Sequence, residues 1–156
     1  MKKSVIILFG FILFTSLIFA NSTTEKFKIF TVKTKLFAKT DLTQFSFKMK
    51  YDPMLFSVKD VTQISNANYV YQNNILTSVD KNLGQIVWSV QDYFGSSMIK
   101  KGSVDLILVK FIALSSSNRG GPFVIIENVS AFDSALNNIK FLILGKRSSI
   151  TLRQLR

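Results

Sequence analysis

Apolar and polar residues alternate along much of this chain, with the period of two that is typical of half-buried strands. The clearest example is Gln44–Tyr51, in which every second residue is apolar: Phe45, Phe47, Met49 and Tyr51. Successive side chains of a strand point to opposite faces. We therefore expect these four residues to face a core, and the polar residues between them to face away from it.

An Asp-Pro corner follows this strand at Asp52-Pro53, and a second strand is expected over Leu55–Thr62. Pro53 has no backbone donor and interrupts a hydrogen-bonded ladder. The alternation with a period of two occurs again at Gln85–Val90, where Ile86, Trp88 and Val90 share one face. We expect Trp88, the only tryptophan, to lie in the core.

Other stretches are rich in aromatic and β-branched residues, which favour strands. The segment Val104–Leu114 is the most apolar part of the mature chain, which predicts a strand covered on both faces, with a buried helix as the alternative. Residues 131–138 could hold a helical turn. The remaining predicted strands are Phe27–Phe30, Val32–Phe37, Ile75–Val79, Phe123–Glu127, Lys140–Leu144 and Ser149–Leu152. A set of about nine short strands separated by turns indicates an all-β, antiparallel sandwich or barrel.

The N-terminal residues have the pattern of a secretory signal peptide. Lys2 and Lys3 precede the apolar run Val5–Phe14, and Ala20 is a small residue at a plausible cleavage point. The alternative is an uncleaved anchor, but a spanning helix needs about 20 apolar residues. We expect a signal peptide at 1–20, one domain at 21–156, no membrane span after cleavage, and a secreted or periplasmic protein.

The residue inventory argues against an enzyme. The chain contains no Cys and no His, which excludes disulfides, the common zinc sites and the usual general base. No G-x-S-x-G motif, P-loop or EF-hand calcium loop is visible. Several acidic residues are interpreted as turn residues: Asp52, Asp80, Asp92 and Asp133. We expect no catalytic site, no cofactor and no metal site.

The chain is basic, with 20 Lys and Arg against 9 Asp and Glu and a formal net charge of +11. The charges are scattered, which is typical of a solvated surface. Export argues against a nucleic-acid partner. An acidic glycan, a cell-wall polymer and an acidic protein remain open as partners.

Four segments, in this order and spacing, resemble the cohesin domain, a β-sandwich that binds dockerins. They are FSFKMKYDPMLFSVKD (45–60), NLGQIVWSVQD (82–92), IKKGSVDLILVKF (99–111), and 123–141 with AFDSALNNIKF inside it. The resemblance implies an antiparallel jelly-roll sandwich over most of the mature chain and a non-enzymatic module that binds a dockerin-like or envelope protein. Family-2 and family-3 carbohydrate-binding modules share this sandwich, so polysaccharide binding, with a role in polysaccharide catabolism, is the second hypothesis. A structural envelope component that assembles through strand edges is the third.

The resemblance also implies where a partner binds, because cohesins hold a dockerin on one flat sheet face. Carried over by position, that face contains Gln44, Ser46, Lys48, Ser89 and Gln91, with Asp92 at the strand end. Lys48 and Lys50 depart from the commoner cohesin pattern, and Lys48 favours an acidic region on the partner. For a glycan, the candidate platforms are instead Tyr69, Tyr71 and Tyr93.

Overall fold

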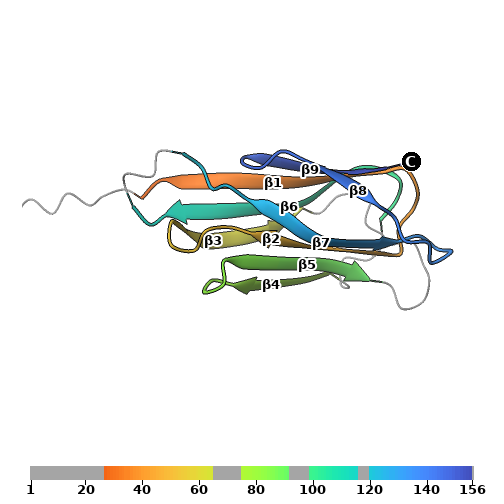
Figure 1. Cartoon of the computed structure of the whole chain (residues 1–156), viewed down its shortest axis with the longest axis horizontal. Coiled ribbons are helices and arrows are strands. Elements are labelled where there is room, and N and C mark those ends of the chain that lie inside the picture. Colours follow the sequence, from red (N-terminus) through yellow and green to blue (C-terminus); the bar gives the residue numbers. More distant parts are fainter. Residues whose placement is uncertain (1–26, 65–74, 92–98, 116–119, 156) are drawn as a thin grey trace, which may run out of the picture.

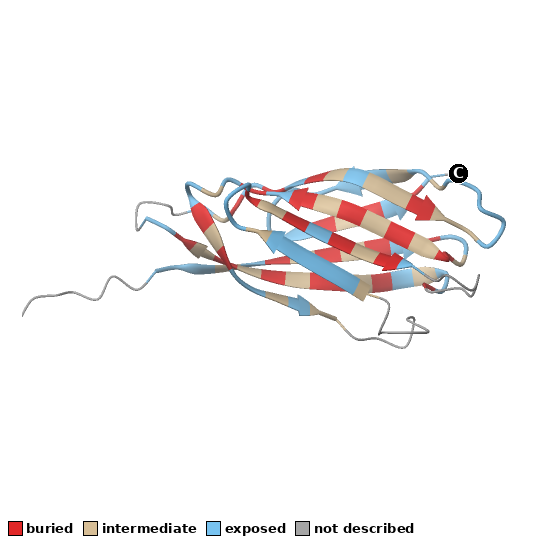
Figure 2. Cartoon of the chain, turned by 90° about the horizontal axis from the view of Figure 1, so that it is seen from below, coloured by how far each residue is buried: buried red, intermediate tan, exposed pale blue. Residues whose placement is uncertain are grey.

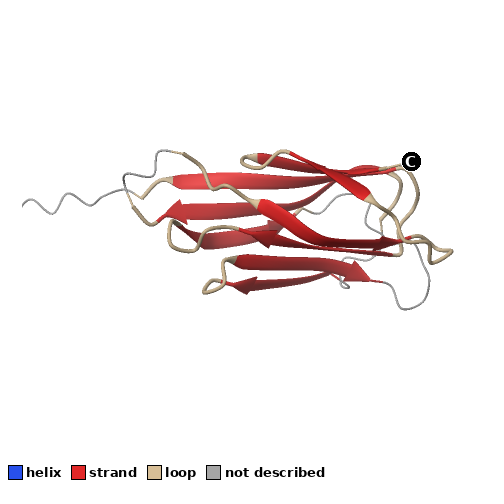
Figure 3. Cartoon of the chain, viewed as in Figure 1, coloured by secondary structure: helices blue, strands red, loops and turns tan. Residues whose placement is uncertain are grey.

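The computed structural model describes residues 27–64, 75–91, 99–115 and 120–155, which form nine strands and, within these ranges, no helix (Figures 1 and 3). The strands are β1 (Ile29–Ala38), β2 (Gln44–Lys50), β3 (Phe56–Gln63), β4 (Ile75–Asp80), β5 (Gln85–Gln91), β6 (Gly102–Ala113), β7 (Ile125–Phe132), β8 (Phe141–Leu144) and β9 (Ser149–Gln154).

The two strands predicted at Phe27–Phe30 and Val32–Phe37 are one continuous strand, β1. The helical turn considered for 131–138 is instead the end of β7 and a tight turn. The expected signal peptide, Tyr69, Tyr71 and Tyr93 lie outside the described residues.

The strands form two sheets packed face to face, as expected for a jelly-roll β-sandwich. A five-stranded sheet has the order β3-β6-β1-β9-β8, and a four-stranded sheet has the order β4-β5-β2-β7. Several consecutive strands lie in opposite sheets, so the chain crosses repeatedly over the core. The pairing is antiparallel except between β1 and β9, which run parallel. Strand periodicity reports only which side chains share a face, and it could not predict this one parallel pair.

The core lies between the sheets and is built from alternate residues, which appear as red bands along the strands (Figure 2). The predicted inward face of β2 is confirmed, because Phe45, Phe47, Met49 and the adjoining Tyr51 are all buried. Trp88 of β5 is fully buried, and its ring stacks on that of Phe47 with centroids 5.7 Å apart. The sequence pattern therefore identified the central aromatic cluster correctly.

The apolar segment predicted that strand β6 is covered on both faces. This prediction is wrong, because only one face of β6 packs against the core. Its outward side chains are half-exposed, and Asp105 among them pairs with Lys33 of β1 at 2.6 Å. The alternation fails at one point for a local reason: Leu106 has no partner opposite the step between Thr34 and Lys35. This bulge places both Leu106 and Ile107 in the core.

Three of the acidic residues assigned to turns do organise turns. The Asp52 carboxylate accepts a hydrogen bond from the Met54 amide at 2.9 Å, and Asp80 accepts bonds from two amides of the β4–β5 turn at 3.0 Å. Asp133 accepts bonds from the Asn137 side chain and from two backbone amides, which lower the pKa of its carboxyl. Asp92 lies outside the described residues.

Candidate functional site

The outer face of the four-stranded sheet is the predicted binding face, and strand parity builds it. On β2, the burial of Phe45 and Phe47 directs Gln44, Ser46 and Lys48 to the opposite side. On β5, the burial of Ile86, Trp88 and Val90 directs four residues outward: Gln85, Val87, Ser89 and Gln91. The inward aromatic cluster thus fixes which polar side chains face outward.

The register of β2 and β5 brings the predicted site residues together. Gln44 lies opposite Gln91, and Ser46 lies opposite Ser89. Lys48 lies opposite Val87. These five predicted residues therefore form one contiguous patch, half-exposed except for Gln91, which is exposed. The sixth predicted residue, Asp92, lies outside the described residues.

The flanking strands add residues that sequence reasoning did not assign to the site. On β4, Leu76 lies beside Ser89 and is 69% exposed. On β7, Ser130 lies beside Ser46, and Glu127 lies beside Lys48. The middle row across the sheet therefore consists of one exposed leucine on β4 followed by three serines on β5, β2 and β7. In that order the residues are Leu76, Ser89, Ser46 and Ser130. Only the cross-strand register shows that these residues adjoin the patch.

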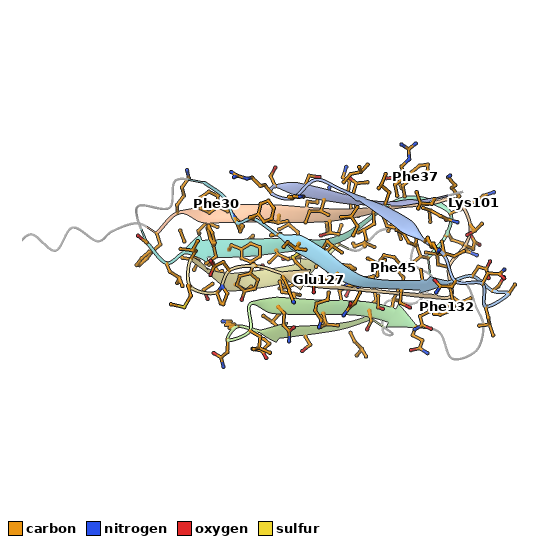
Figure 4. All side chains as sticks on the ribbon, in the orientation of Figure 1. Phe30, Phe37, Phe45, Lys101, Glu127 and Phe132 are labelled. Carbon is orange, nitrogen blue, oxygen red and sulfur yellow. The ribbon has the colours of Figure 1, made fainter. Side chains whose placement is uncertain are left out.

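A β-bulge in β7 shapes the edge of this face. The register shifts between Ser46 and Lys48, and Asn128 has a positive φ of 51°. Asparagine tolerates this left-handed conformation better than most residues. The extra residue lets both Glu127 and Ser130 lie on the outer face while Val129 packs against the core. Figure 4 labels Glu127 and Phe132 on β7, together with Phe45 of β2.

The charges on this face are few. Lys50 pairs with Glu127 at 3.0 Å, and both side chains remain partly exposed. Lys48 makes no ion pair with an acidic side chain in the described part of the chain. The face is thus uncharged in its middle row, with one unpaired cation beside it.

A shallow pocket of about 330 Å³ adjoins this face at the Asp-Pro corner, where Tyr51, Leu55, Phe56 and Phe123 contribute to its lining. Burial raises the pKa of the Tyr51 phenol, and the nearby Asp80 carboxylate raises it further. Tyr51 is therefore neutral near pH 7, and its ring packs edge-on against Phe111 with centroids 5.0 Å apart. This arrangement is a packing contact of the core.

No group of three or more acidic, His or Cys side chains is placed to hold a metal ion among residues 27–64, 75–91, 99–115 and 120–155. No helix long and apolar enough to cross a membrane occurs in those same segments.

Comparison with known proteins gives the class of this two-sheet domain. The model of the Cohesin domain family matches residues 19–144. The chain therefore belongs to the cohesin domain family. No protein in the curated set compared with it matches.

Solved cohesin structures have the same fold. One is the third cohesin of ScaC from Acetivibrio cellulolyticus, in complex with the ScaB dockerin: TM-score 0.57, 11% identity, 82% of this chain and 99% of that one covered. A second is the type I Coh-OlpC–Doc435 cohesin–dockerin complex of Clostridium thermocellum: TM-score 0.55, 11% identity, coverage 83% and 97%. A third is the cohesin CaCohA2 of Clostridium acetobutylicum: TM-score 0.55, 14% identity, coverage 81% and 90%. At these identities the likeness extends to the fold alone.

Proposed function

We propose that this chain is an exported, non-enzymatic docking module that binds a dockerin-like protein on the outer face of the β4-β5-β2-β7 sheet. The observation that carries the proposal is the contiguous patch formed by Gln44, Ser46, Ser89 and Gln91. A flat row of short polar side chains beside an exposed leucine suits a protein surface, in which apolar contact and hydrogen bonds alternate. Lys48 favours an acidic region on the partner.

Polysaccharide binding is the weaker alternative for this face. A sugar chain is usually held by aromatic rings that lie flat on the surface. Trp88, the only tryptophan, is fully buried, and the described residues that form the middle row of the face carry no ring.

Ser46→Trp should abolish docking, because a bulky ring in the middle row would hold the two surfaces apart. We expect the affinity for the partner to fall by at least about tenfold, which corresponds to roughly 1.4 kcal/mol. The matched control is Thr151→Trp, which places the same ring on the outward face of β9 in the other sheet.

The measurement is a pull-down of exported proteins from the source organism, followed by titration of the captured protein. The proposal expects a captured protein with dockerin-type calcium loops, whose capture is lost on chelation of calcium. Equal capture by Ser46→Trp and Thr151→Trp would place the interface elsewhere. Capture of a polysaccharide in place of a protein would favour the alternative.

Export makes a separate prediction. Cleavage after Ala20 removes the basic and apolar leader, so N-terminal sequencing of the protein from culture fluid or periplasm should begin at or near Asn21. A protein that retains Met1 and needs detergent for extraction would contradict cleavage and favour an anchor.

A further inference from the structure

The edge strand β8 exposes an unusual run of apolar residues. Leu142, Ile143 and Leu144 are 47%, 39% and 44% exposed, although they belong to a hydrogen-bonded strand at the end of the five-stranded sheet (Figure 1). Proteins normally protect such edges with charges, bulges or proline, since an edge presents unpaired backbone groups. The sequence of β8, FLIL, contains none of these.

The other three edge strands in the described part of the chain each have a protecting feature. Strand β3 carries Lys59 and Asp60. Strand β7 is bulged at Asn128, and β4 carries the polar residues Thr77 and Ser78 and ends at the charged Asp80. Strand β8 is therefore the edge best suited to accept another strand.

The backbone groups available on β8 follow from its pairing with β9. The Leu155 amide donates to the Lys140 carbonyl at 2.9 Å, and Phe141 lies opposite Gln154. In an antiparallel ladder, hydrogen-bonded and non-hydrogen-bonded pairs alternate. The N–H and C=O groups of Phe141 and Ile143 therefore point away from β9, toward the free edge.

A groove runs alongside this edge. A cavity of about 250 Å³ lies between β8 and the start of β7, and its lining includes Phe123, Ile125, Ile143 and Lys146. Phe123 and Ile125 are 50% and 47% exposed. A strand added to β8 would direct alternate side chains into this apolar groove.

The charges around the edge select the partner. Residues 140–156 contain no Asp or Glu, whereas Lys140, Lys146, Arg147 and Arg153 surround β8. None of these four makes an ion pair with a described acidic residue. Antiparallel pairing of two copies of this chain centred on Ile143 would bring Lys140 of one copy close to Lys146 of the other. Like charges disfavour that arrangement and favour an acidic partner.

We propose that the free edge of β8 is a second docking site, which accepts an extended protein segment with alternating apolar residues and acidic flanks as an added strand. This site lies on the other sheet from the proposed dockerin face and does not depend on it. Ser46→Trp should leave binding at β8 unchanged, so the two proposals fail independently.

The test uses a capped synthetic peptide, Glu-Asp-Val-Thr-Val-Thr-Val-Asp-Glu, titrated into the purified protein and followed by amide NMR shifts. We expect saturable binding, with the largest shifts at Phe141 and Ile143. Ile143→Pro removes an edge donor that β9 does not use, and should weaken binding at least about tenfold. Ile143→Val keeps the donor and a branched side chain, and should bind within about twofold of the unchanged protein.

A peptide with N-methyl groups at alternate residues gives the same test on unchanged protein, in case Ile143→Pro does not fold. Replacing the acidic flanks by lysine should weaken binding at low salt, and the difference should shrink as salt increases. No binding of the acidic peptide at about 1 mM overturns the proposal, as does equal binding of the methylated or lysine-flanked peptides. A concentration-dependent dimer that Ile143→Pro abolishes would also overturn it, because the occupant would then be a second copy of the chain.

Discussion

Phe47→Ala should lower the free energy of unfolding by about 3–5 kcal/mol, the typical cost of removing a buried phenylalanine ring. Phe47 is 1% exposed, and its ring stacks on Trp88 and lies 6.1 Å from that of Phe45. The substitution would leave a cavity at the centre of the aromatic cluster, where backbone pairing on both sides of β2 limits collapse of the surrounding residues.

The matched control is Ser46→Ala, one residue away on the same strand. Ser46 faces outward and is half-exposed, so this change should alter stability by less than about 0.5 kcal/mol. Denaturant unfolding of the two variants measures the difference directly. Similar small shifts in both would show that the assignment of the two faces of β2 is wrong.

Gly84→Ala should destabilise the protein by roughly 2–5 kcal/mol, because two separate costs add. Gly84 has a φ of 60°, which is unfavourable for a residue with a side chain. An added Cβ would also collide with the Tyr51 carbonyl oxygen and approach Cδ of Pro53 at 2.7 Å. The β4–β5 turn is held against the Asp-Pro corner here, since the Tyr51 amide donates to the Gly84 carbonyl at 2.9 Å.

Gly120→Ala is the control for this prediction. Among the described residues, a Cβ at Gly120 would meet only the Arg147 guanidinium, at an ordinary contact distance of 3.5 Å. Chemical unfolding should therefore separate the two variants clearly. A Gly84→Ala protein as stable as Gly120→Ala would mean that the turn moves freely away from the corner.

The sequence was sufficient to predict those features that depend on local alternation. The inward face of β2, the burial of Trp88 and the outward direction of Gln44, Ser46, Lys48 and Ser89 all follow from a period of two. The turn roles of Asp52, Asp80 and Asp133 follow from the capacity of a short carboxylate to accept nearby amide hydrogen bonds.

Features that depend on pairing between distant strands were not predictable in this way. The position of Leu76 and Glu127 beside the patch requires the register of β4 and β7, which periodicity does not encode. The bulge at Asn128 falls on an exposed polar residue and leaves no mark in the hydrophobic pattern. The open outer face of β6 was missed because its bulge places Leu106 and Ile107 in the core together, and this resembles a strand covered on both sides.

The parallel pairing of β1 with β9 has a consequence for how the chain folds. Strand β9 lies between β1 and β8, so the five-stranded sheet stays divided until the last described strand takes its place. The Gln154 side chain then accepts a hydrogen bond from the Lys39 amide at 2.6 Å, across 115 positions of sequence. Contacts between such distant residues form late and slow the search for the native state. The five-stranded sheet therefore closes last, when the β8–β9 hairpin, whose own pairing joins residues close in sequence, docks on β1.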